Sequence, residues 1–406
     1  MKYFLSYCLL LTVFGAACVS KEGVPKEFYT QILVFGNASS AFYAAVQAAK
    51  SNAEVIWLSE ESKNTFPTDN KNIKILDNHQ LISTIVDGNI LRGAVFLSGK
   101  DTIKIFSKMS IDASECGKLI ELSGADFTVE KDSVSCERTK ITANFIHNLQ
   151  DLSKIRQSVF SANYLIQKND SVQIKMPFIL PYEVFFSPKI QGLLAAEKNI
   201  SINKTVLLEN ESDFLEKIGM AAGALATLCV EQNIYPKQLE IRQLQQMMLN
   251  SKIPLFEYAN ISINDWAFES VQKSFVSGIL KPDPFFGADS SIFAKEMLEI
   301  LTLSSNKNIS ANLQKIATEK QTQVINRYQA IHFLWQQLDS PKAELNHLVY
   351  EDFVTAQKPV LMYFQEQNWT KNWAEGNLFE GAKPIKRKEL LFLIETSLSP
   401  FVNKEN

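Results

Sequence analysis

The chain has 406 residues, of which 46% are hydrophobic and 21% are charged. This is enough apolar material for a globular core and for about two or three domains, and it excludes a disordered chain. The formal net charge of -3, without a run of Lys and Arg among aromatic residues, argues against nucleic acid as a partner.

The first residues, MKYFLSYCLLLTVFGAACVS, join one basic residue to an apolar run and then to small residues. This order is typical of an export signal, so residues 1–18 are interpreted as a signal peptide. The small residues before Cys18 resemble a bacterial lipobox, in which Cys18 would be lipidated. The alternative is ordinary cleavage near Ala17. The chain is therefore expected in the cell envelope, as a periplasmic or surface lipoprotein that touches the membrane only through this anchor.

The remaining cysteines and the histidines predict neither a disulfide framework nor a metal site. Outside the signal region, three cysteines remain, of which Cys116 and Cys136 could form one bridge although nothing demands it. The four histidines give no ligand pair at helical spacing, and no CxxC is present. No metal is therefore predicted.

A β-α-β unit is predicted early in the chain. Ile32–Phe35 and Val55–Leu58 are short apolar runs of the kind that form strands buried on both faces. Between them, small side chains recur on one face of a helix and let it lie close to a sheet; these are Ala41, Ala44, Ala45 and Ala48. The predicted fold class is α/β, with a Rossmann-type domain.

The turn after the first strand has the position of a dinucleotide-binding loop but only part of its chemistry. In the pattern G-x-G-x-x-G/A, the three key positions are Gly36, Ala38 and Ala41. The methyl group of Ala38 stands where bare backbone should approach a pyrophosphate. Ser39 and Ser40 offer hydroxyls at a helix N-terminus that attracts anions, or one of them simply caps the helix.

Several segments resemble, in this order, the FAD-dependent oxidoreductase family often called xanthan-lyase-like. After the glycine loop, they are residues 108–127, 191–206, 219–227 and 235–239. The resemblance covers roughly residues 27–250 in patches. It implies a glutathione-reductase-like FAD/NAD(P)-binding domain, with FAD as the cofactor and a reduced substrate insert at about 127–176.

The resemblance places the family's cofactor-binding positions on particular residues of this chain. The glycine loop falls on residues 36–41 and the acidic ribose ligand on Glu60, which follows the second strand. A segment beside the flavin falls on residues 193–201, with Glu197 in place of a glycine and Lys198 next to it. A flavin-side helix falls on Gly219 to Gly223, whose small residues would pack against a strand or a flat ring.

Three of these segments depart from the family pattern together. Ala38 replaces a glycine, Lys118 replaces an acidic residue, and Glu197 brings a carboxylate beside the diphosphate. Two like charges at 4 Å repel by about 1 kcal/mol in bulk water and by more in a drier site. The short insert also makes a roofed substrate pocket doubtful. No catalytic residue is identified.

Residues 251–406 are predicted to form a helical domain, because amphipathic helices separated by Pro, Gly and Asp turns replace the earlier pattern. Parts of it resemble S-layer-homology repeats, with Arg327 and Arg387 at the repeat's arginine position. The resemblance implies a cell-wall or carbohydrate partner with an anionic group. The favoured interpretation is that the aromatic residues pack one helix pair on the next; they are Trp266, Phe275, Phe285, Phe286, Trp335, Trp373 and Phe379.

Two functions follow from these patterns. The first is an exported flavin oxidoreductase that acts on a carbohydrate or another small molecule. The second is a non-catalytic relative with weakened or lost flavin binding, which uses the scaffold for binding or assembly at the envelope. The altered cofactor positions favour the second.

Overall fold

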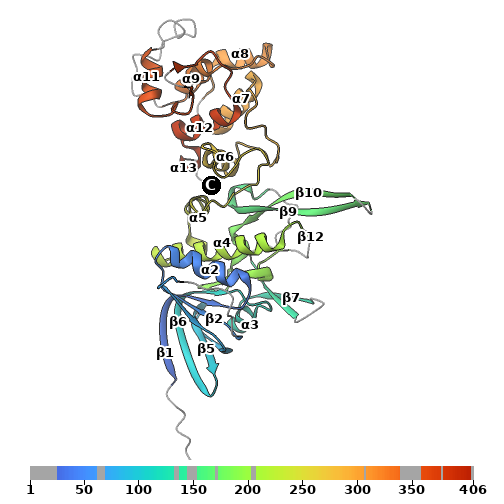
Figure 1. Ribbon diagram of the computed structural model, residues 1–406, viewed down its shortest axis with the longest axis vertical. Helices are drawn as coiled ribbons and strands as arrows, with labels where there is room; N and C mark the ends of the chain where they lie inside the picture. The colour runs from blue at the N-terminus through green and yellow to red at the C-terminus, as the bar shows by residue number, and fades with distance from the viewer. Residues whose placement is uncertain are drawn as a thin grey trace, which may run out of the picture.

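A computed structural model describes residues 25–61, 69–131, 137–143, 153–169, 172–202, 207–305, 308–338, 358–375 and 378–403. An α/β part occupies one end of the elongated molecule and a helical part the other (Figure 1). The predictions for residues 1–18, including Cys18, fall outside these ranges, as does Cys136. Cys116 is disulfide-bonded. Within the ranges given, no helix combines the length and apolar composition that a membrane crossing needs.

The predicted β-α-β unit is confirmed and forms the centre of the main sheet. Its strand order is β3-β2-β1-β6-β5-β4, with β11 also paired to β6. The strands β3, β2, β1 and β6 run parallel, whereas β5 and β4 continue the sheet as an antiparallel meander. The elements are β1 (Lys26–Phe35), α2 (Ser39–Lys50), β2 (Val55–Leu58), β3 (Ile73–Leu76), β4 (Gln80–Asp87), β5 (Ile90–Ser98) and β6 (Asp101–Asp112).

The strand β6 has different neighbours along its two halves. Its first half pairs with β5, and its last three residues pair in parallel with β11 (Leu193–Ala195). On its other side it pairs with β1 up to Phe35 and Asp112. The carboxyl ends of β1, β6 and β11 therefore meet at one edge of the sheet, where ligands bind in open α/β folds.

Two smaller sheets lie between β6 and α4, in the region predicted as the insert. One is the hairpin of β7 and β8, and the other has the order β10-β9-β12, so that β10 is an edge strand. The β9–β10 hairpin projects from the body of the molecule (Figure 1). Their bounds, with the preceding helix, are α3 (Lys118–Ser123), β7 (Phe127–Lys131), β8 (Glu137–Ile141), β9 (Ser158–Asn169), β10 (Val172–Pro181) and β12 (Leu207–Leu208).

The helix α4 (Glu211–Glu231) lies against α2 at backbone distance (Figure 1). A Cβ atom at Gly219 would lie 2.3 Å from the carbonyl oxygen of Ser40, and one at Gly223 would lie 2.4 Å from that of Ala44. Only glycine fits at these two positions. The two glycines of this stripe thus face α2, and α4 also packs on β6, β1 and β11, so the predicted contact with strands is present beside one that was not predicted.

Among the described residues, the helical part contains three successive helix pairs after α5 (Ile241–Asn250). Each pair has an isoleucine two residues before its second helix, and the three isoleucines form a closed ring. The amide of Ile325 donates to the carbonyl of Ile292, that of Ile385 to Ile325, and that of Ile292 to Ile385, at 2.9 to 3.1 Å. The pairs are α6 (Phe268–Val276) with α7 (Ala294–Ser304), α8 (Ala311–Glu319) with α9 (Arg327–Trp335), and α11 (Lys358–Glu366) with α12 (Arg387–Leu398).

Arginine–glutamate pairs join neighbouring helix pairs around this ring. Arg387 at the start of α12 makes a two-pronged contact with Glu296 of α7, and Arg327 of α9 makes one with Glu389 of α12. The corresponding third contact is missing, because Ala294 and Gln329 occupy its two positions. Both arginines of the S-layer-homology resemblance are thus engaged inside the helical part.

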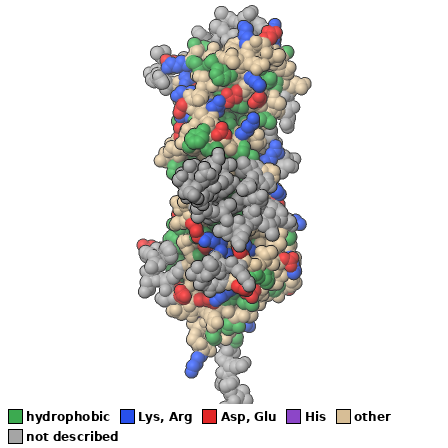
Figure 2. All heavy atoms as spheres, turned by 90° about the vertical axis from the view of Figure 1, so that its right-hand side faces the viewer, with side chains coloured by type: hydrophobic (Ala, Val, Ile, Leu, Met, Phe, Trp, Pro, Cys, Tyr) green, Lys and Arg blue, Asp and Glu red, His purple; other side chains and the backbone are tan. Residues whose placement is uncertain are grey.

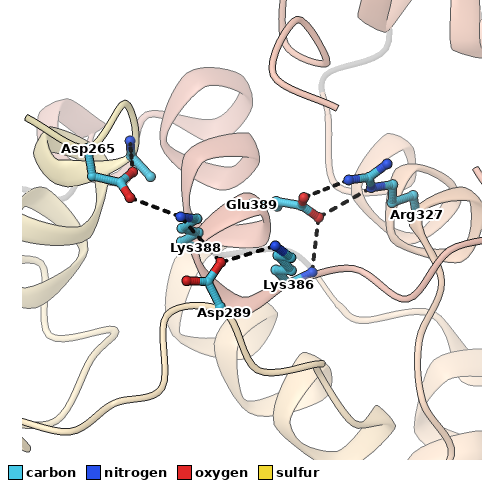
Figure 3. Close-up of polar contacts among 7 residues, drawn as sticks. Asp265, Asp289, Arg327, Lys386, Lys388 and Glu389 are labelled. Carbon is cyan, nitrogen blue, oxygen red and sulfur yellow. Dashed lines mark hydrogen bonds and ion pairs between the residues drawn. The ribbon is translucent and has the colours of Figure 1, made fainter. Parts of the chain in front are cut away.

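A second layer of ion pairs lies beside this ring. Figure 3 shows Lys388 between Asp265 and Asp289, at 2.9 and 3.3 Å, and Lys386 on Asp289 at 3.2 Å. On the face of the helical part seen in Figure 2, basic and acidic side chains are interspersed. That face carries no large patch of one sign.

The prediction that the aromatic residues of this region are core anchors is confirmed for some and wrong for others. Phe275, Phe286, Trp335 and Trp373 are buried. Trp266 is 38% exposed, yet its ring packs edge to face on Phe392 of α12 with 5.1 Å between the ring centroids, so it does join two helix pairs. Phe285 is 74% exposed and lies in the turn between α6 and α7, so the prediction is wrong for this residue. The side chain of Phe379 lies outside the described set; its strand is β14 (Leu378–Phe379), which pairs with β13 (Ala374–Glu375).

The last helix, α13 (Pro400–Asn403), lies at the junction of the two parts, near α5 and α6 (Figure 1). The Phe401 ring has the guanidinium of Arg242 from α5 at 4.9 Å and the ammonium of Lys273 from α6 at 5.1 Å. Glu395 of α12 is 8% exposed there, and one of its carboxylate oxygens is buried without a hydrogen-bond partner. Burial raises the pKa of Glu395 to about 7, against the opposing charges of Lys273 and Arg242.

We expect Gly223→Ala to destabilise the protein by about 1 to 3 kcal/mol, because the added methyl group meets the backbone of α2. Elsewhere in a helix the same change stabilises by up to about 1 kcal/mol, so the sign of the effect tests the contact. The measurement is chemical denaturation, with Glu231→Ala on the exposed end of α4 as the control. A neutral or stabilising effect would contradict the contact.

We expect Arg327→Ala to cost about 3 to 5 kcal/mol, because it leaves the carboxylate of Glu389 buried without its partner. Arg327 and Glu389 are 7% and 3% exposed. Replacing both with Met and Leu should restore most of the loss. Lys383→Ala, which breaks an exposed pair with Glu380, is the control and should cost less than about 1 kcal/mol.

We expect the stability of the wild type to fall as the pH rises, relative to Glu395→Gln. The folded pKa of about 7 lies above the ordinary value of 4.5, so the contribution is fully present below 4.5 and lost as the pH passes about 7. Between a pH below 4.5 and pH 8, the wild type should lose about 3 kcal/mol of unfolding free energy relative to Glu395→Gln. Unfolding at a series of pH values measures it, with Glu319→Gln as an exposed control; parallel curves for wild type and Glu395→Gln would refute it.

Candidate functional site

The candidate site is the edge of the sheet where β1, β6 and β11 end together. The amide of Ala113 donates to the carbonyl of Phe35 at 2.8 Å, and that of Ala196 donates to Asp112 at 2.7 Å. These two hydrogen bonds connect the loops that follow the three strands. Of the predicted cofactor-binding positions, residues 36–41 and 197–198 come together here.

Gly36 is required by the backbone at this edge. Its φ is +138°, and a Cβ atom would lie 2.1 Å from the carbonyl oxygen of Ala113. The indole of Trp57, at the end of β2, donates to the Gly36 carbonyl at 3.0 Å. Gly36 therefore has the role of the first glycine in a dinucleotide-binding turn, which is to let the chain pass close to the neighbouring strand.

The N-terminus of α2 faces a carboxylate from the chain itself. Glu197 is 6% exposed, and its Oε2 accepts a hydrogen bond of 2.8 Å from the hydroxyl of Ser40, which is fully buried. Burial raises the pKa of Glu197, while the Ser40 bond and the charges of Lys198 and Arg138 oppose that shift. The position in which a helix N-terminus holds a phosphate group is thus next to an acidic side chain.

The remaining loop residues do not act as predicted for a helix cap. Ala38 is the N-cap residue of α2, and no side chain caps the helix there. Ser40 is committed to Glu197, whereas Ser39 is half-buried at the first position of the helix and Ala41 is buried against the core. The alternative that one serine caps α2 was therefore wrong.

Glu197 has a backbone conformation that glycine adopts more easily. Its φ is +60°, in the left-handed region, where a non-glycine residue is strained by about 1 to 2 kcal/mol. The family resemblance has a glycine at this position. The strain indicates that the surrounding contacts, including the bond to Ser40, hold Glu197 in place.

Glu60, the predicted ribose ligand, forms an ion pair with Lys118 at the start of α3. Lys118 stands where the family resemblance has an acidic residue, so a position that departs from the family pattern contacts one that keeps it. This pair was not predicted. The signal in the sequence was a basic residue, Lys118, at a position where the family has an acidic one, while the acidic residue Glu60 was retained in another loop.

Asp112 and Asn199 hold the loop that should close over a diphosphate. The fully buried carboxylate of Asp112 accepts from the amide and hydroxyl of Ser114 and from the amide of Ile120, at 2.6 to 3.0 Å. Burial raises its pKa, and these bonds oppose the shift. Asn199, also buried, donates to the carbonyl of Ser114 at 2.5 Å. The loop is therefore fixed by the chain's own groups.

Three of the predicted positions, Lys198, Gly219 and Gly223, are used in contacts between elements of the fold. Lys198 pairs with Glu211 at the start of α4. Gly219 and Gly223 are used in the contact with α2 described above. Taken together, the residues present do not fit the diphosphate of FAD, because the Glu197 carboxylate lies at the N-terminus of α2, where a phosphate would bind, and takes the Ser40 hydroxyl.

No protein-family model matches the chain, and no curated protein does. Similar solved structures include a GidA-related protein from Thermus thermophilus, with 12% identity over 50% of this chain and 99% of that chain, at a TM-score of 0.31. A geranylgeranyl bacteriochlorophyll reductase-like protein from Thermoplasma acidophilum has 10% identity over 84% and 99%, at 0.33. A flavoprotein/dehydrogenase from Cytophaga hutchinsonii has 10% identity over 68% and 92%, at 0.31.

These TM-scores are low, so the fold assignment stands on the chain's own topology. The β-α-β unit, the parallel strands β3, β2, β1, β6 and β11, and the antiparallel meander make it an α/β protein of Rossmann type. This confirms the predicted fold class. It is the type of fold on which FAD-dependent oxidoreductases are built.

Proposed function

We propose that this chain is a non-catalytic protein of the cell envelope that keeps an FAD-dependent-oxidoreductase-like fold as a scaffold. The observation that carries the proposal is the buried carboxylate of Glu197, bonded to Ser40 at the N-terminus of α2. Export and a lipid anchor at Cys18 belong to the same proposal and rest on the sequence of residues 1–18.

The Glu197 carboxylate opposes a diphosphate in two ways. It uses the hydroxyl of Ser40 beside the positive end of α2, which would otherwise be available to an anion. When ionised, it also repels a phosphate at 4 Å by about 1 kcal/mol in bulk water and by about 4 kcal/mol at a protein surface. Moving it aside requires a new conformation of a buried loop.

The Glu60–Lys118 pair supports the same conclusion at the other end of the site. Glu60 lies where the resemblance places the ribose ligand, and the Lys118 ammonium already occupies one of its carboxylate oxygens. A group that would bind the ribose of a flavin thus has a partner within the chain.

The test is a titration of the mature protein with FAD, followed by flavin absorbance and by fluorescence quenching. We expect no saturable binding at concentrations up to about 100 μM. The double variant Ala38→Gly with Glu197→Gly restores both glycine positions, and we expect it to bind FAD at least about tenfold more tightly than the wild type. Asn368→Gly, at an exposed residue with the same φ of +60°, controls for the backbone change.

Saturable flavin binding by the wild type, or a flavin spectrum in the purified protein, would overturn the proposal. In that case the alternative, an active flavin oxidoreductase acting on a carbohydrate or another small molecule, becomes the function to pursue.

A further inference from the structure

A groove of about 450 Å³ lies between the two parts of the molecule, away from the edge where β1, β6 and β11 end. The β9 and β10 strands contribute one wall. The other wall comes from the chain between α5 and α6, from α6 itself and from the turn between α6 and α7. Asn163 and Pro177 line the first wall; Phe256, Glu257, Ile263 and Phe285 are among the residues of the second. Its volume is in the range typical of small-ligand sites.

The apolar lining combines a buried floor with an exposed rim. Phe256 is fully buried, whereas Ile263 and Phe285 are 44% and 74% exposed. Phe285 is held in a turn by the bond from its amide to the carboxylate of Asp283, at 2.9 Å. Phe285 and Ile263 both line the groove and are both exposed, and apolar side chains gathered at the rim of a groove indicate a binding surface.

A polar pair lies in the same groove. The carboxylate of Glu257 accepts from the Asn163 amide at 2.9 Å and from the Lys217 ammonium at 2.5 Å. A carboxylate has about four acceptor sites, so Glu257 can also accept from a ligand hydroxyl. Among the residues that line the groove, Glu257 alone is charged, and its carboxylate is paired with the Lys217 ammonium. The groove therefore favours an uncharged ligand that carries hydroxyl groups.

We propose that this groove binds a neutral carbohydrate chain. The C–H face of a sugar ring packs on the electron-rich face of Phe285, and its hydroxyls bond to Glu257 and Asn163. A peptide that adds a strand to the edge of β10 is disfavoured, because Pro177 and Pro181 lack the N–H groups that such pairing uses. The proposal does not depend on whether FAD can bind at the edge where β1, β6 and β11 end.

The test measures binding of short linear oligosaccharides of glucose and of N-acetylglucosamine to the full mature chain by titration calorimetry. We expect saturable binding by the wild type and a loss of about tenfold or more in Phe285→Ala. Tyr29→Ala is the matched control, because Tyr29 on β1 is 72% exposed but far from the groove in sequence and in the fold; its binding should be unchanged. Binding should also be insensitive to salt, since the ligand is uncharged.

Four results would overturn the proposal. They are no saturable binding of any neutral oligosaccharide tested, equal binding by Phe285→Ala and the wild type, equal losses in Phe285→Ala and Tyr29→Ala, and binding restricted to an apolar peptide or to a charged oligosaccharide. Circular dichroism of each variant establishes that the fold is kept. The flavin titration is independent of this result, so the two proposals fail or succeed separately.

Discussion

The contact between α4 and α2 fixes the position of the candidate site. Gly219 and Gly223 bring the two helices to backbone distance, and the alanine face of α2 keeps it equally close to the sheet. A helix held on both sides has no freedom to shift along its axis. The N-terminus of α2 is therefore held beside the ends of β6 and β11. The loop that follows β11 supplies the side chain that faces it, which is Glu197.

At this edge of the sheet, side chains of the same protein bond to the polar groups of the loops. A buried polar group must be hydrogen-bonded, and in a cofactor-binding domain some of those bonds are made by the ligand. Here Ser40 is bonded by Glu197, Glu60 by Lys118 and Ser114 by Asn199. Two of the three departures from the family pattern, Glu197 and Lys118, thus bind groups of the same edge. A dinucleotide would have to displace several of them at once.

Local patterns in the sequence predicted the parts of the fold that depend on residues close together in the chain. The first β-α-β unit follows from apolar runs and small-residue spacing, and Gly36 follows from the close approach that only glycine permits. The Glu60–Lys118 pair was not predictable in this way, since the residues lie 58 positions apart and meet only through the order of the strands. The first of the three helix pairs is the least regular in sequence, because Phe293 and Ala294 stand where the other two pairs have a polar residue and an arginine. Phe285 shows that an apolar residue in a turn has no helical spacing to reveal whether it is buried.

The closed ring of Ile292, Ile325 and Ile385 has a consequence for the order in which the chain folds. The amide of Ile292 is satisfied only by Ile385, and the amide of Arg387 at the start of α12 returns to the carbonyl of Ser290. The first helix pair thus waits for residues that follow much later in the chain. During synthesis the helical part stays open while the α/β part before it can already be complete, so the apolar faces of the first helix pair stay exposed until α12 has been made.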